Sequence, residues 1–145
     1  MQSQNLELRK QIDETVASLR QRTTAQPTVG IILGTGLGRM AHEIKAEVII
    51  PYDEIPHFPL STVESHRGKL IIGTLSGKTV IAMQGRFHYY EGYSMKQITF
   101  PVRVMKALGV ETLLISNACG ALNPLYRNAD IMLIDDPITS FGDNP

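Results

Sequence analysis

Apolar and polar residues recur along this chain with two different periods, and the change of period divides it into elements. Residues 5–22 carry apolar side chains about one helical turn apart, among charged and amide residues: Leu8, Ile12, Val16 and Leu19. This spacing predicts an amphipathic helix. Pro27 ends the pattern, and the short apolar run 29–33, bounded by glycines, predicts a buried strand.

The rest of the chain continues with short elements separated by glycine and proline. Ser94 is a suitable N-cap for a helix that ends at Gly109, and Pro101 inside it predicts a kink or a late first turn. A Pro-rich loop spans residues 51–67. The other predicted elements are a helix over 37–44, strands over 47–51, 69–73, 78–84, 111–116 and 131–134, and a β-hairpin that joins 69–73 to 78–84.

Buried strands that alternate with helices predict an α/β fold with a largely parallel sheet. Three loops with small or polar residues directly follow predicted strands: 34–38, 85–92 and 117–121. Ligands of such sheets bind outside the carboxyl ends of the strands. We therefore expect these three loops to form one small-molecule site.

Composition narrows the kind of ligand and the compartment. The 14 Lys and Arg balance the 14 Asp and Glu, so no basic excess favours nucleic acid. Uncharged apolar stretches are too short to span a membrane. The single cysteine, Cys119, excludes an internal disulfide, and the four histidines lack metal-binding spacing, so we expect no metal. A cytoplasmic protein with a small anionic ligand fits these features best.

Two glycine-containing motifs resemble phosphate-binding sequences to different degrees. The turn 34–38, Gly-Thr-Gly-Leu-Gly, can bring backbone N–H groups to an anion, or it can be a plain strand-to-helix turn. It is not a dinucleotide motif, because Arg39 stands where the last glycine is required. Residues 76–79, Ser-Gly-Lys-Thr, imitate a P-loop, but they lie between two predicted strands and predict a hairpin turn.

The segment 85–93 concentrates side chains that can bind a ligand or transfer a proton: Arg86, His88, Glu91 and three tyrosines lie within nine residues. An arginine can clamp phosphate or carboxylate through its planar fork, and a glutamate can orient a histidine. The alternative is a surface turn with an ion pair and packed aromatics. His66 and Arg67 add a second histidine and arginine in the Pro-rich loop.

Taken together, these motifs resemble the trimeric, low-molecular-weight class of purine nucleoside phosphorylases. The string Gly-Arg-Phe-His-Tyr-Tyr-Glu-Gly-Tyr at 85–93 is the most specific part of the resemblance. The other matching segments follow in the family's order: 34–38, Ser61-Thr62-Val63 with His66 and Gly68, 99–104, and 117–124.

The resemblance implies a glycosyltransferase of purine salvage that cleaves purine (deoxy)nucleosides with orthophosphate, which is a co-substrate, and uses no cofactor. It implies a twisted mixed sheet flanked by helices. It also implies site residues: Thr35, His66, Arg86, Phe87, His88 and Ala118 for phosphate, Tyr90 for ribose, and Asn117 with Ala118 beside the purine. His88 and Glu91 would be catalytic, with Glu91 orienting His88.

The resemblance covers the N-terminal half of the family's single domain, with residues 1–27 as an N-terminal helix and linker and 28–145 as the phosphate and ribose core. Pro137 replaces a usual histidine, and 128–129 differ from the family pattern. We expect the chain alone to be marginally soluble or to self-associate, and to turn over little or no substrate. The alternatives are a non-catalytic phosphate- or nucleoside-binding module, and a half-subunit that needs a partner chain; the full-length family would form homotrimers.

Overall fold

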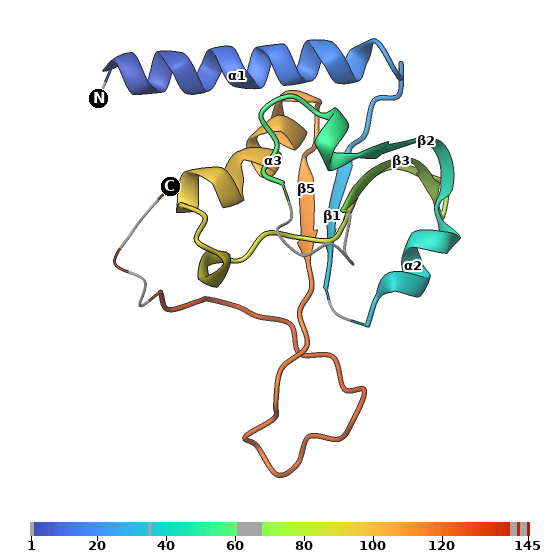
Figure 1. Cartoon of the computed structure of the whole chain (residues 1–145). Helices are drawn as coiled ribbons and strands as arrows, with labels where there is room; N and C mark the ends of the chain where they lie inside the picture. The colour runs from blue at the N-terminus through green and yellow to red at the C-terminus, as the bar shows by residue number, and fades with distance from the viewer. Residues whose placement is uncertain (1, 35, 61–67, 140–141, 143–144) are drawn as a thin grey trace.

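The computed structural model describes residues 2–34, 36–60, 68–139, 142 and 145, and the side chains from residue 5 onward. Within these residues a five-stranded sheet is flanked by helices (Figure 1). The elements in chain order are α1 (Gln2–Arg20), β1 (Val29–Leu33), α2 (Gly38–Glu43), β2 (Lys45–Pro51), η1 (Tyr52–Glu54), β3 (Lys69–Leu75), β4 (Lys78–Gln84), η2 (Tyr89–Glu91), α3 (Met95–Ala107) and β5 (Thr112–Ile115).

The sheet is mixed, with the strand order β2-β3-β4-β1-β5. Strands β2, β3 and β4 form an antiparallel meander, whereas β1 pairs in parallel with β4 on one side and with β5 on the other. The mixed sheet implied by the resemblance is therefore confirmed. The largely parallel sheet expected from the strand pattern holds only for β4, β1 and β5.

Alternating residues of the strands fill two cores, one on each face of the sheet. Ile31 and Leu33 of β1 join Ala41 of α2 on one face. On the other face, Ile81 of β4 packs with residues of α1 and α3, such as Leu19. Because successive strand residues point to opposite faces, apolar residues at nearly every strand position are what a sheet covered on both sides requires.

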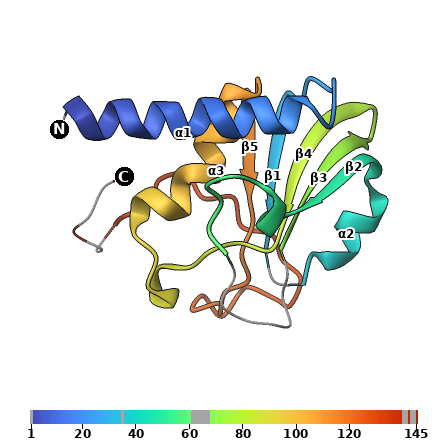
Figure 2. The ribbon, with the colours of Figure 1, turned by 45° about the horizontal axis from the view of Figure 1, so that its top comes forward.

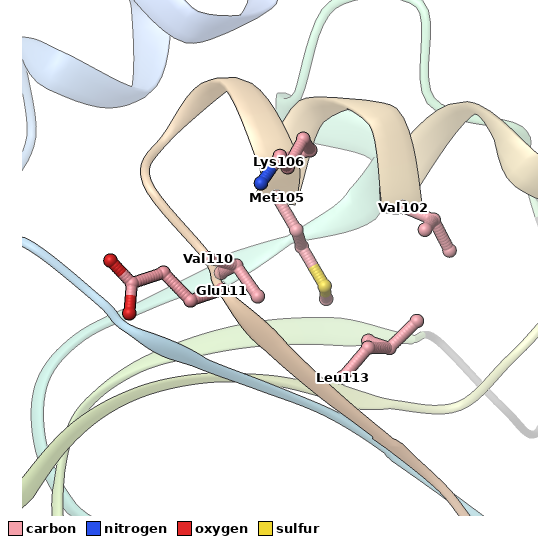
Figure 3. Close-up of a pocket in the computed structure, with 6 residues that line it drawn as sticks. All are labelled: Val102, Met105, Lys106, Val110, Glu111 and Leu113. Carbon is pink, nitrogen blue, oxygen red and sulfur yellow. The ribbon is translucent and has the colours of Figure 1, made fainter.

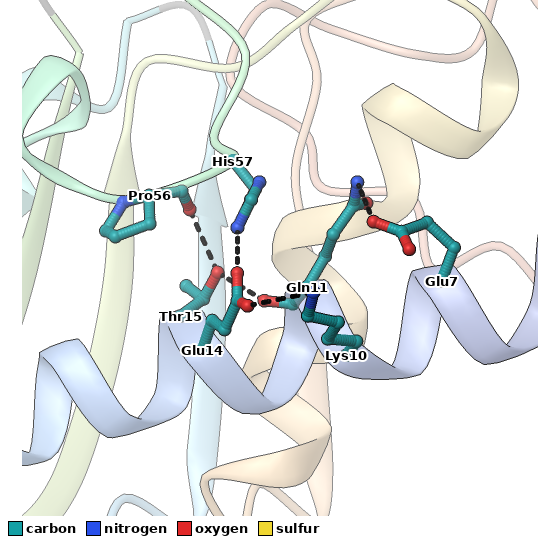
Figure 4. A network of polar contacts seen from close by, with 7 residues as sticks. All are labelled: Glu7, Lys10, Gln11, Glu14, Thr15, Pro56 and His57. Atoms are coloured by element: carbon teal, nitrogen blue, oxygen red, sulfur yellow. Dashed lines mark hydrogen bonds and ion pairs between the residues drawn. The ribbon is translucent and has the colours of Figure 1, made fainter.

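Helix α1 lies across the end of the sheet opposite to the carboxyl ends of the parallel strands (Figures 1 and 2). Its apolar stripe packs against the core, as the helical spacing predicts: Leu19 is buried, and Leu8, Ile12 and Val16 are partly buried. Polar contacts hold the helix to the loop after η1 (Figure 4). The buried Thr15 hydroxyl donates a hydrogen bond to the Pro56 carbonyl at 2.9 Å, and His57 Nε2 lies 2.7 Å from Glu14.

Local sequence signals fix several boundaries. Ser94 caps α3 by accepting a hydrogen bond from the Gln97 N–H, and Pro101 lies inside the helix. Residues Ser76 and Gly77, both with positive φ, form the two-residue turn between β3 and β4. The prediction that residues 76–79 form a hairpin turn, and not a P-loop, is thus confirmed.

The predicted strand over 131–134 is wrong. Its four apolar residues are exposed and pair with no strand in the described part of the chain. An apolar run becomes a strand only where a neighbour supplies hydrogen bonds, and sequence cannot show whether one does. Among the described residues, no helix combines the length and apolar character that crossing a membrane requires.

Candidate functional site

The three loops expected to form one site do lie at neighbouring strand ends. They follow β4, β1 and β5, which are adjacent and parallel, so their carboxyl ends share one edge of the sheet. Two hydrogen bonds join the loops directly. Arg86 Nη1 donates to the Ser116 carbonyl at 2.8 Å, past the end of β1, and the Gly34 N–H donates to the Ser116 hydroxyl at 3.0 Å.

Three side chains of the β4 loop form a continuous hydrogen-bonded chain. Arg86 Nε donates to His88 Nε2 at 3.2 Å, and His88 Nδ1 lies 2.6 Å from Glu91 Oε1. An arginine N–H can only donate, so Nε2 of His88 accepts and carries no proton. The proton of the neutral imidazole is therefore on Nδ1, where it is donated to the carboxylate of Glu91.

The orientation of His88 follows from the local backbone. His88 is the N-cap of η2, and the Glu91 carboxylate accepts a second hydrogen bond from the His88 backbone N–H at 3.0 Å. Gly92, with φ of 92°, ends the turn in the left-handed conformation that glycine adopts most easily. The sequence from His88 to Gly92 thus presents the imidazole in a fixed direction.

The aromatic residues of this segment divide between surface and core. The Tyr90 ring stacks on the His88 ring with centroids 4.7 Å apart and is 82% exposed. The Phe87 ring is buried against Tyr52 and Tyr93, so Phe87 can reach a ligand at this edge only through its backbone. Burial, and then the charge of Glu91, raise the pKa of Tyr93.

Tyr52 also contacts the segment after β4 through a hydrogen bond, which the sequence pattern did not indicate. Its buried hydroxyl donates to the Gly85 carbonyl at 2.7 Å, and burial raises the pKa of this phenol. Gly85 has φ of 96° and directly precedes Arg86. Gly68 must be glycine here, because a Cβ would lie 2.1 Å from the Tyr52 ring.

Of the remaining predicted site residues, the structure describes only some. Thr35 and His66 lie outside the described residues. Asn117 and Ala118 are exposed at the end of β5, beside the Arg86 contact to Ser116. Within the described residues, no three His, Cys, Asp or Glu side chains are grouped to hold a metal ion.

A pocket elsewhere on the molecule is separate from this arrangement. It lies between α3 and β5 and is mostly apolar, with Lys106 and Glu111 at its margin (Figure 3). Its lining residues are Val102, Met105, Lys106, Val110, Glu111 and Leu113. None of the candidate site residues lines it, so the chemistry-bearing residues gather at the strand ends and not in this pocket.

Comparison with known proteins gives a consistent result. Residues 28–145 match the model of the phosphorylase superfamily. The purine nucleoside phosphorylase 1 of Bacillus subtilis is 53% identical over 138 residues, which are 95% of this chain and 51% of that protein. The chain thus spans about half the length of the curated relatives it matches.

Solved structures agree with the sequence match. A Schistosoma mansoni purine nucleoside phosphorylase in complex with inosine superposes with a TM-score of 0.75 at 45% identity, covering 81% of this chain and 41% of that one. A purine nucleoside phosphorylase in complex with ribose 1-phosphate gives a TM-score of 0.75 at 49% identity, covering 79% and 42%.

Proposed function

The chain belongs to the phosphorylase superfamily, and from this membership we propose that it takes part in the reversible phosphorolysis of purine nucleosides. The substrates are a purine (deoxy)nucleoside and orthophosphate, and the products are free purine and (deoxy)ribose 1-phosphate. The relatives named purine nucleoside phosphorylase, and their complexes with inosine and ribose 1-phosphate, support this substrate class. The enzyme would be a glycosyltransferase without a cofactor.

The proposed reaction exchanges one bond at C1′ of the sugar. A phosphate oxygen forms a bond to C1′ while the glycosidic bond breaks, and the electron pair of the broken bond leaves with the purine. The purine takes up one proton, which balances the proton that HPO4²⁻ loses on becoming the sugar phosphate dianion. The site must therefore hold an anion beneath C1′ and keep it aligned with the breaking bond. Such positioning and electrostatic preorganisation are the main sources of rate enhancement in sites of this kind.

The chain of Arg86, His88 and Glu91 carries this proposal. The guanidinium supplies charge and planar donors to a phosphate, and only part of it is engaged by Ser116 and His88. His88 lies next to it at the same strand end, held by Glu91. We assign Arg86 and His88 to phosphate binding and Glu91 to the orientation of His88.

The other site residues complete the proposal. We assign the Ala118 backbone N–H, the Thr35 hydroxyl, His66 and the Phe87 backbone as further phosphate donors. We assign Tyr90, which is exposed and stacks on His88, to the ribose. Asn117 would lie beside the purine.

The proposal extends to assembly and compartment. We propose a homotrimer, which the resemblance implies for the full-length family, in the cytoplasm, which the composition favours. The outer strand β5 leaves Leu114 and Ile115 exposed, and surfaces of this kind are available for contacts with further polypeptide. Light scattering on the purified protein measures the assembly, and a monomeric mass would contradict the trimer.

Two measurements test the activity. The first follows release of hypoxanthine from inosine with and without phosphate. The second measures inorganic phosphate binding by calorimetry for the wild type and for Arg86→Ala, with Arg22→Ala as the control because Arg22 pairs with Glu54 on the surface. We expect loss of binding only in Arg86→Ala. Unchanged affinity in that variant would refute the assignment, and phosphate binding without phosphorolysis would indicate a binding module.

A further inference from the structure

Ser116, the residue after β5, contacts β1 and the segments that follow β1 and β4. Its hydroxyl accepts from the Gly34 N–H at 3.0 Å and lies 3.3 Å from the Ile32 carbonyl, to which it donates. Its own carbonyl accepts from Arg86 Nη1 at 2.8 Å. We propose that Ser116 is a positioning residue that sets the geometry of the phosphate site.

The hydroxyl extends the pairing of β1 and β5 beyond the last regular pair. That pair is Ile32 with Ile115, and the Ser116 N–H still reaches the Ile32 carbonyl at 3.3 Å. The next donor along the chain, just past β1, is the Gly34 N–H, and the Ser116 hydroxyl accepts its hydrogen bond. The start of the glycine turn is therefore fixed to β5 by a side chain and not by the backbone ladder.

The approach of the two strands here is unusually close. A Cβ on Gly34 would lie 2.2 Å from the Ser116 carbonyl oxygen, so only glycine fits this position. The hydroxyl holds Gly34 at this distance, which in turn limits how far the Ser116 carbonyl can rotate. A peptide carbonyl that cannot rotate is a fixed acceptor for the arginine on the far side of β1.

The fixed carbonyl directs Arg86. A guanidinium has five N–H donors in one plane, so holding Nη1 on Ser116 and Nε on His88 sets the direction of the others. In the phosphate site proposed above, those donors face the anion. Ser116 thus acts through Arg86 and Gly34, and its inferred role rests on the proposed function.

The test compares removal of this hydroxyl with removal of a buried hydroxyl elsewhere. Ser116→Ala removes it, Ser116→Thr retains it, and Thr15→Val removes a buried hydroxyl that contacts Pro56 far from the site. Inorganic phosphate binding is measured by calorimetry at a temperature where all variants are folded. We expect about tenfold weaker binding for Ser116→Ala, recovery in Ser116→Thr, and unchanged affinity in Thr15→Val.

In phosphorolysis, the same defect should raise the KM for phosphate and leave the KM for inosine unchanged. Ser116→Cys fills the same space with weaker hydrogen bonds and replaces Ser116→Ala if that variant does not fold. Wild-type affinity in Ser116→Ala, or equally weak binding in Ser116→Thr, overturns the inference while the proposed function stands. Failure of the wild type to bind phosphate refutes the proposed function itself.

Discussion

Phosphate binding should draw a proton to His88. In the structure, Nε2 of His88 accepts from Arg86 and Nδ1 faces the Glu91 carboxylate at 2.6 Å. The phosphate dianion HPO4²⁻ has one O–H, and its other three oxygens only accept, so Nε2 can donate to one of these three only after gaining a proton. The other neutral tautomer would place a bare Nδ1 against a carboxylate oxygen, which is repulsive. When Nε2 donates to one of these three oxygens, binding should therefore take up as much as about one proton per phosphate; we expect this arrangement because Arg86 and His88 then both donate to the anion.

The perturbation is Glu91→Gln, which keeps an acceptor near Nδ1 and removes its charge. Hydrogen bonds to charged groups contribute about 1.5–3 kcal/mol and neutral ones about 1 kcal/mol. The imidazolium formed on binding would thus lose about 1 kcal/mol or somewhat more, because Glu91 is largely shielded from water. The phosphate dissociation constant should rise about five- to tenfold, and proton uptake should fall.

Calorimetry in buffers with different ionisation enthalpies measures the uptake directly, since each transferred proton adds the buffer's heat. The control is His88→Gln, which cannot titrate and should show no buffer dependence. Binding by the wild type without buffer dependence, at a pH where phosphate is already a dianion, would refute donation from His88 Nε2 to the anion. Persistent uptake in His88→Gln would place the proton on another group and refute the assignment to His88.

Two further predictions concern stability. Tyr52→Phe should lower the free energy of unfolding by about 1–3 kcal/mol at neutral pH. Because burial raises the pKa of Tyr52 above its usual 10.0, the wild type should also lose about 1.4 kcal/mol more per pH unit than the variant between about pH 10 and 12. Equal pH dependence of the two unfolding free energies, measured with urea, would contradict this. Gly34→Ala should cost at least about 2 kcal/mol, because its Cβ would meet Ser116, whereas Gly38→Ala, with open space around it, should be near neutral in the same assay.

The sequence predicted which loops come together at the candidate site better than it predicted the residues that hold those loops in place. Loops 34–38, 85–92 and 117–121 could be assigned to one edge because the apolar runs before them indicated buried strands. The pairing of His88 with Glu91 was expected because a nearby glutamate can orient a histidine and the resemblance implied this role for Glu91. These inferences depend on local periodicity and short-range geometry, which a sequence displays directly.

The roles of Ser116 and Tyr52 could not be predicted because both depend on contacts between distant segments. A serine at a strand end and a tyrosine in a Pro-rich loop are ordinary in sequence, and only the fold brings them to Gly34 and Gly85. The error at 131–134 has the same origin, since pairing is a property of neighbours and not of the run itself.

The position of β1 in the sheet has a consequence for the order of folding. Val29 of β1 pairs with Val80 of β4 and with Thr112 of β5, both far along the chain, whereas β2, β3 and β4 pair in sequence order. Long loops close at greater entropic cost, and such pairings form late. The contact of Arg86 with Ser116 exists only once β5 has joined, so phosphate binding would be acquired at the final stage of folding, after most of the sheet is in place.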